Sequence, residues 1–252
     1  MKIRFLILLL LICVLTACGA EKAPAVPADP PPAAQPEETP AETPAAETPP
    51  LEGTPLTAEE LAQVDEAFNS YAHVGNEKAL EAGCFFTSCY EDVTELNFEE
   101  FLRYYFTDSH DLTDQDAEEF QALAALPGFH WDAEDLERWG NVPSGLPVPV
   151  HRIPRAAVDR TLETYAGITT ADLKNTDSVL YLSDYDSYYN FTSDYGPGFF
   201  QAAEGARDGN TVRLRSEPAW ADGGEVIQEL TLREEDGRWL IQSFTRRPAG
   251  NG

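Results

Sequence analysis

The chain has 252 residues, and its 44 Asp and Glu side chains outnumber its 17 Lys and Arg side chains, which gives a formal net charge of −27. A field of that sign opposes binding to nucleic acid and to anionic lipid headgroups, because both are polyanions. Neither is therefore an expected partner. Hydrophobic residues make up 42% of the chain, which is enough for one domain with a core.

Residues 1–17 have the composition of a secretory signal. Lys2 and Arg4 form a basic start, and a nearly unbroken apolar run follows from Phe5 to Leu15. A membrane-spanning helix needs about 20 apolar residues, so this run is too short for a permanent span. We expect residues 1–17 to be a cleaved signal peptide.

The residues Leu15-Thr16-Ala17-Cys18 resemble the lipobox of bacterial lipoproteins. The resemblance implies that the thiol of Cys18 takes a diacylglyceryl group and that the peptide is cut before this residue. It implies a protein held by lipid on the extracytoplasmic face of the cell membrane, with the membrane as its partner. Cleavage removes two basic residues and no acidic ones, so the net charge of the mature chain changes from −27 to −29. The lipid alone then provides the membrane binding.

Residues 18–55 form a low-complexity segment of Ala, Pro, Glu and Thr, in which Glu-Thr-Pro recurs from Glu38, Glu42 and Glu47. Such a segment cannot bury enough apolar surface to offset its ordering entropy. Its prolines favour the extended polyproline II conformation, at about 3.1 Å per residue. We expect a disordered tether that holds the body away from the membrane.

The remaining residues, 56–248, are expected to form a single α+β extracytoplasmic domain whose first half is helical. Pro154 suits the first turn of one helix, Gly167 its end, and Thr170 the cap of a short helix that follows. Capping signals predict the starts of four other helices, at Thr57, Asn97, Thr113 and Asp132.

The last third of the chain changes to a strand-like pattern. Glycine-containing turns separate segments that read as strands, namely 179–182, 199–202, 211–216, 226–233 and 238–245. Helices followed by hairpin-connected strands favour an α+β fold, with a four- to five-stranded antiparallel sheet after the helical half. From residue 207 onward there are 7 basic and 8 acidic residues, so the acidic excess lies in the tether and the helical half.

Cys84 and Cys89 are the two thiols of the expected body, because Cys13 leaves with the signal and Cys18 carries lipid. Outside the cytoplasm, a pair five residues apart indicates a disulfide that closes a small loop. A zinc site would need histidines at matching spacing, and the four histidines of the chain are scattered. The sequence therefore predicts no zinc site and leaves other metals open.

The densest polar segment runs from Asp184 to Asp194. If it is extended, one face carries Asp184, Asp186, Asn190 and Asp194, and the other face is aromatic. An oxygen-rich face of this kind suits calcium or a polar ligand such as a glycan, although the glycine and distal glutamate of a calcium loop are absent. The alternative is a strand whose aromatic face lies in the core and whose acidic face is only hydrated.

No nucleophile elbow, phosphate-binding glycine loop or dinucleotide fingerprint occurs, so no cofactor is expected. The favoured hypothesis is a non-enzymatic lipoprotein that binds or scaffolds an unknown ligand of the cell envelope. A calcium- or carbohydrate-binding module and an envelope hydrolase with paired carboxylates remain alternatives. Segments at 152–154, 181–189 and 236–243 look similar to uncharacterised lipoproteins of Gram-positive bacteria, and this resemblance implies no activity.

Overall fold

A computed structural model of the chain describes residues 49–68, 81–192, 196, 198–221 and 223–249. All of them belong to one compact unit, residues 43–252. The expected signal peptide, Cys18 and most of the tether lie outside the described residues. Within the described ranges, no helix is both long enough and apolar enough to cross a membrane.

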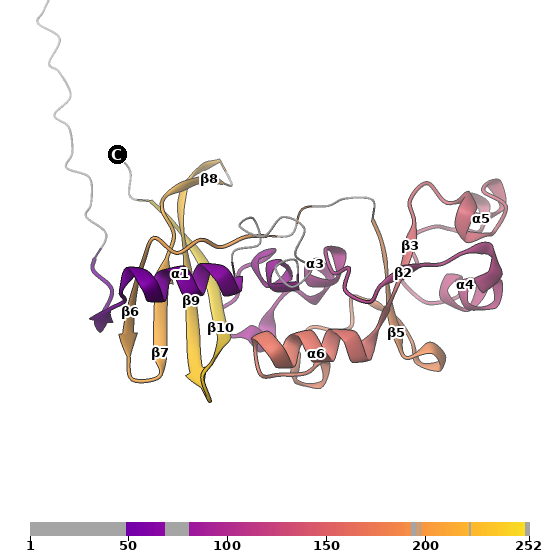
Figure 1. The fold of residues 1–252 in the computed structure, drawn as a ribbon. Coiled ribbons are helices and arrows are strands. Elements are labelled where there is room, and N and C mark those ends of the chain that lie inside the picture. Colours follow the sequence, from indigo (N-terminus) through magenta and orange to yellow (C-terminus); the bar gives the residue numbers. More distant parts are fainter. Residues whose placement is uncertain (1–48, 69–80, 193–195, 197, 222, 250–252) are drawn as a thin grey trace, which may run out of the picture. The chain divides into compact units, whose positions relative to one another are not determined.

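The chain folds into helices and antiparallel sheets, which confirms the α+β prediction (Figure 1). The helices are α1 (Ala58–Phe68), α3 (Phe98–Arg103), α4 (Ala117–Ala124), α5 (Ala133–Arg138) and α6 (Arg155–Tyr165). The short 3₁₀ turns are η1 (Cys84–Phe86), η2 (Val93–Glu95), η3 (Asp114–Asp116), η4 (Pro143–Gly145), η5 (Thr170–Asp172) and η6 (Ser183–Tyr185).

Two sheets organise these elements. The larger one has the strand order β1 (Thr54–Pro55), β6 (Glu204–Asp208), β7 (Thr211–Arg215), β9 (Gly224–Glu235) and β10 (Arg238–Pro248), and β8 (Ala219–Ala221) also pairs with β9. The smaller one has the order β2 (His110–Asp111), β3 (Val150–Pro154), β5 (Ser187–Phe191) and β4 (Leu180–Leu182). Helix α1 lies across one face of the larger sheet in Figure 1, and its side chains Val64 and Phe68 are buried in the core.

Local capping chemistry sets the helix starts, and the four predicted caps are confirmed. Thr57 forms a reciprocal box with Glu60, and the side chains of the other three accept from backbone amides two or three residues later. Gly167 follows α6 with a φ of 70°, as expected for a helix end. The cap predicted at Thr170 lies one residue earlier, since Thr169 forms the capping box with Asp172 at the start of η5.

The strand predictions were only partly right. The segment 199–202 is not a strand, although its side chain Phe200 is buried in the core. The described residues form six strands in one sheet and four in another, where one sheet of four or five strands was expected. Two strands of the smaller sheet, β2 and β3, come from the half that was expected to be helical, and β1 comes from the end of the expected tether.

Two apolar clusters hold these layers together. The larger cluster joins side chains of both sheets, such as Ile153 and Leu230, with the aromatic face of α3. The smaller cluster packs α4 and α5 against the other face of the smaller sheet. Strand β5 lies between the clusters, because its neighbours Tyr188 and Tyr189 point to opposite faces.

Candidate functional site

A hollow of about 480 Å³ lies around the end of β5. Strand β4 pairs with β5 only as far as Leu180 opposite Tyr189, so the next residues of β5 have no partner on that side within the described sheet. Helix α3 and the loops before α5 and β3 enclose the remaining space. The lining residues are Glu99, Leu102, Arg103, Gly128, His130, Trp131, Pro147, Val148, Ser178, Val179, Leu180, Tyr189, Asn190 and Phe191.

Aromatic rings form one wall of the hollow. The ring of Trp131 meets the ring of Phe191 nearly at right angles, with their centroids 4.8 Å apart. Phe129, His130 and Trp139 also contact Trp131 edge-on. Edge-to-face contacts of this kind fix the plane of an aromatic ring. Trp131 therefore offers a half-buried, oriented surface to anything that enters the hollow.

Asn190 supplies the hollow with a hydrogen-bonding group that is not satisfied within the protein. Its amide nitrogen donates to the carbonyl oxygen of Leu102 in α3. Its Oδ1 atom is shielded from solvent and has no hydrogen-bond partner among the described residues. An unpaired buried acceptor costs about 1–3 kcal/mol, and a ligand that donates to it recovers that cost.

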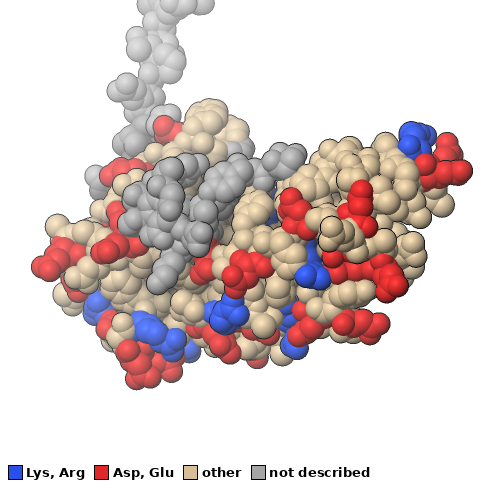
Figure 2. Space-filling view, turned by 45° about the vertical axis from the view of Figure 1, so that its right-hand side comes forward, with Lys and Arg blue, Asp and Glu red and all other residues tan. Residues whose placement is uncertain are grey.

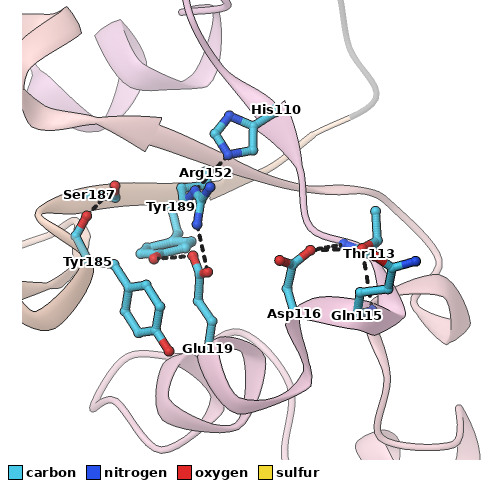
Figure 3. A network of polar contacts seen from close by, with 9 residues as sticks. All are labelled: His110, Thr113, Gln115, Asp116, Glu119, Arg152, Tyr185, Ser187 and Tyr189. Atoms are coloured by element: carbon cyan, nitrogen blue, oxygen red, sulfur yellow. Dashed lines mark hydrogen bonds and ion pairs between the residues drawn. The ribbon is translucent and has the colours of Figure 1, made fainter.

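Tyr189 lines the hollow and is held from behind by a polar network that runs from buried Glu119 to exposed His110 (Figure 3). Its hydroxyl donates to Glu119 Oε1 at 2.6 Å, and Arg152 Nη1 donates to Glu119 Oε2 at 2.8 Å. Arg152 Nε in turn donates to His110 Nε2 at 2.7 Å. Glu119 is only 3% exposed, so this carboxylate depends on the two donors for its solvation.

The network also affects the protonation of the Tyr189 hydroxyl. Burial, together with the neighbouring Glu119 carboxylate, raises the pKa of its hydroxyl. The phenol therefore stays protonated and keeps its proton directed at Glu119. This arrangement locks the ring in place and does not supply a free acid or base to the hollow.

A second polar group joins strands of the same sheet. His151 is buried, and its Nδ1 lies 2.7 Å from Asp111 Oδ1 while its Nε2 lies 2.8 Å from the carbonyl oxygen of Thr192. These contacts tie β2, β3 and the end of β5 together. They bind the sheet and do not reach the hollow, whose lining includes none of the three residues.

Residues 184–186 are not extended, which corrects this part of the ligand face predicted from Asp184 to Asp194. Asp184 lies exposed in η6, and Asp186 ends that turn in a left-handed conformation with a φ of 44°. Only Asn190 reaches the hollow, and Asp194 lies outside the described residues. Asp184 and Asp186 therefore precede the strand, because β5 begins only at Ser187.

Asp186 is engaged by its neighbours. Arg155 Nε donates to its Oδ1 at 2.7 Å, and the hydroxyl of Tyr181 donates to the same oxygen at 2.6 Å. These two donors hold the pKa of the Asp186 carboxyl below its usual value. The carboxylate therefore secures the turn between β4 and β5. Among the described residues, no group of three or more histidine, cysteine or acidic side chains is placed to hold a metal ion.

The expected disulfide is also absent from the structure, which has thiols at both positions. Cys84 is buried in η1, and its thiol donates to the carbonyl oxygen of Tyr104 at 3.3 Å, whereas Cys89 is exposed. The 3₁₀ turn directs the first side chain into the core, and the chain then turns outward. Sequence spacing alone contains no information about this divergence.

Sequence reasoning missed Glu119, Arg152, Tyr189 and His110 as a group. They come from four different elements, and the ladder that places His110 opposite Arg152 and Arg152 opposite Tyr189 has no local sequence signal. Acidic side chains are spread over the face seen in Figure 2 with basic ones among them, so charge does not single out the network either. Comparison with protein-family models, curated proteins and solved structures found no match to the chain.

Proposed function

We propose that this chain is a lipid-anchored lipoprotein of the bacterial cell envelope whose body binds a ligand in the hollow beside β5. The lipobox-like residues before Cys18 and the acidic tether after it support the anchoring. The observation that supports binding is the unsatisfied Oδ1 atom of Asn190 in the wall of the hollow. Concave sites with apolar walls and a few fixed polar groups are typical of ligand-binding proteins.

Recognition fits the hollow better than hydrolysis by paired carboxylates. Among its lining residues Glu99 is the single carboxylate, and the buried Glu119 lies behind Tyr189. Two carboxyl groups must flank the scissile bond in the usual glycosidase mechanism. The groups that line the hollow instead offer hydrogen bonds and an aromatic surface.

The aromatic wall favours a neutral glycan as the ligand. A sugar ring presents C–H groups on its faces and hydroxyls at its edge, so it can lie on Trp131 while a hydroxyl donates to Asn190. Ser178 and Arg103 lie in the same lining and can serve other hydroxyls. Calcium receives less support, because the predicted aspartates are not brought together.

Binding can be tested with the mature chain carrying Cys18→Ser, titrated calorimetrically with soluble oligosaccharides of bacterial cell walls. We expect Asn190→Leu and Trp131→Ala each to weaken binding at least about tenfold, because each removes one face of the site. Trp220→Ala is the matched control, since Trp220 is 76% exposed and does not line the hollow. Failure of every oligosaccharide to bind, or equal affinity in all variants, contradicts the glycan proposal.

Anchoring has its own test. Cells expressing the chain and fed a clickable fatty acid should label it, and Cys18→Ser should abolish the label. Cys13→Ser is the matched control, because Cys13 lies within the expected signal peptide. Labelling that persists in Cys18→Ser would show that the lipid is carried elsewhere.

A further inference from the structure

The polar face of the larger sheet carries two arginines and two threonines in a square. In the pairing of β7 with β9, Thr211 lies opposite Arg233 and Arg213 lies opposite Thr231. Directly paired residues share a face and lie about 5 Å apart, and diagonal neighbours lie about 7–8 Å apart. The four side chains therefore form one patch, with the guanidinium groups on one diagonal and the hydroxyls on the other. The opposite face of the same strands holds the core residues Val212, Leu214, Leu230 and Leu232.

The two arginines have donor groups that the protein does not use. Arg213 makes no ion pair with a carboxylate of the described residues, and its Nη1 is shielded from solvent without an acceptor. Arg233 pairs through Nη2 with Glu235 at 3.0 Å, while its Nε is shielded and lacks an acceptor. In a chain with 44 acidic and 17 basic side chains, an arginine without a carboxylate is unexpected.

Two neighbouring arginines on the same face, Arg215 and Arg247, are paired with carboxylates. Arg215 Nε and Arg247 Nε both donate to Glu229 Oε1, at 2.7 and 2.8 Å. Arg215 also pairs with Glu204 at 3.3 Å. Arg247 Nη2 is also shielded without an acceptor, so what sets the square apart from Arg215 and Arg247 is Arg213, which pairs with no carboxylate of the described residues.

Small side chains flank two of the four corners of the square. Ala206 of β6 lies opposite Arg213, and Ser243 of β10 lies opposite Thr231. Two acidic side chains adjoin the square: Asp208 lies opposite Thr211, and Glu235 pairs with Arg233. The small side chains thus adjoin Arg213 and Thr231, whereas the larger Leu240 of β10 lies opposite Arg233.

We propose that this square binds a tetrahedral oxyanion, namely a phosphate group. Both guanidinium groups can only donate, and the hydroxyls of Thr211 and Thr231 can donate as well. A carboxylate has two oxygens and is filled by one guanidinium, whereas phosphate has enough oxygens for both arginines and a threonine. The site lies on a different sheet from the hollow and does not depend on the function proposed for the hollow.

The test is calorimetric titration of the mature Cys18→Ser chain with inorganic phosphate at constant ionic strength. We expect saturable binding that Arg213→Gln weakens about tenfold or more and that acetate does not reproduce. Arg138→Gln is the matched control, because it makes the same charge change on the exposed face of α5. No saturable phosphate binding, or an unchanged affinity in Arg213→Gln, overturns the proposal.

Two further arms complete the test. If Arg213→Gln lowers the melting temperature without phosphate, Thr231→Val takes its place, since it keeps the side-chain shape and removes one donor. Its affinity should fall measurably, and an unchanged affinity would overturn the proposal. A second titrant, glycerol 3-phosphate, identifies the source of the anion. Binding as tight as phosphate or tighter assigns the site to a phosphate monoester, and weaker binding assigns it to free phosphate.

Discussion

Glu119 and Tyr189 are joined by a buried hydrogen bond of 2.6 Å, although they stand 70 residues apart in the chain. The bond connects α4 to β5, an inner strand of the smaller sheet. Because Arg152 neutralises the same carboxylate, the contact links three elements through one side chain. Tyr189 also lines the hollow, so the packing of α4 determines the position of one wall of the proposed ligand site.

Glu119→Gln should therefore destabilise the body. The substitution keeps the side-chain size but leaves Arg152 without its counter-charge and weakens the bond to Tyr189. We expect a loss of about 2–3 kcal/mol in the free energy of unfolding, measured by urea denaturation. Glu118→Gln is the control, because Glu118 is exposed on the same helix, and it should change stability by less than about 0.5 kcal/mol. Equal effects of the two substitutions would contradict the role given to the network.

Features that arise from neighbouring residues could be predicted from the sequence. The box formed by Thr113 and Asp116 spans four residues, so its pattern is visible in the chain itself. The turn at Asp236-Gly237 was equally readable, since both residues have positive φ, 52° and 72°, and this dipeptide tolerates that conformation.

Features that depend on distant pairing could not be predicted. Strand β3 has no clear alternation, because both of its faces are covered, and its partner β5 starts only after the left-handed residue Asp186. The hollow exists because β4 pairs with β5 no further than Leu180. The sequence predicts Asn190 as part of an acidic face. Its position in the structure instead depends on this pairing and on the hydrogen bond to Leu102 of α3.

The two thiols should react differently. Burial raises the pKa of Cys84, and the nearby Glu81 carboxylate adds to the effect, while Cys89 is exposed. In a chain with Cys13→Ser and Cys18→Ser, a maleimide at pH 7 should label one thiol in the native state and two in urea, as counted by mass spectrometry. Cys89→Ser should remove the native-state label. Labelling that requires prior reduction would restore the disulfide prediction.

Two glycines offer a matched test of backbone strain. Gly237 has a φ of 72°, and a Cβ added there meets no atom within 4 Å, so an alanine would be penalised by conformation alone. Gly237→Ala should cost about 1 kcal/mol of unfolding free energy. Gly224 also has open space and lacks the positive φ, so Gly224→Ala should change stability by less than about 0.5 kcal/mol. A neutral Gly237→Ala would contradict the assigned turn.

The capping carboxylates should make the body sensitive to acid. Backbone and side-chain hydrogen bonds from Thr57, Thr113 and Thr169 lower the pKa values of Glu60, Asp116 and Asp172. Each carboxyl therefore binds a proton less readily in the folded chain than in the unfolded chain. Their contribution to stability is complete above the ordinary values, 4.5 for Glu60 and 3.8 for the aspartates, and is lost as the pH falls through the lowered values.

We expect the free energy of unfolding to stay nearly constant from pH 7 to about pH 5 and to decrease below about pH 4. Asp116→Asn removes one of these titrating groups, so its stability should depend less on pH in the acidic range, although it is lower at pH 7. Asp184→Asn is the control, because Asp184 is exposed in η6, and it should follow the wild-type curve. Denaturation in urea at each pH measures both curves. Parallel acid dependence of Asp116→Asn and the wild type would show that the capping boxes do not contribute to acid sensitivity.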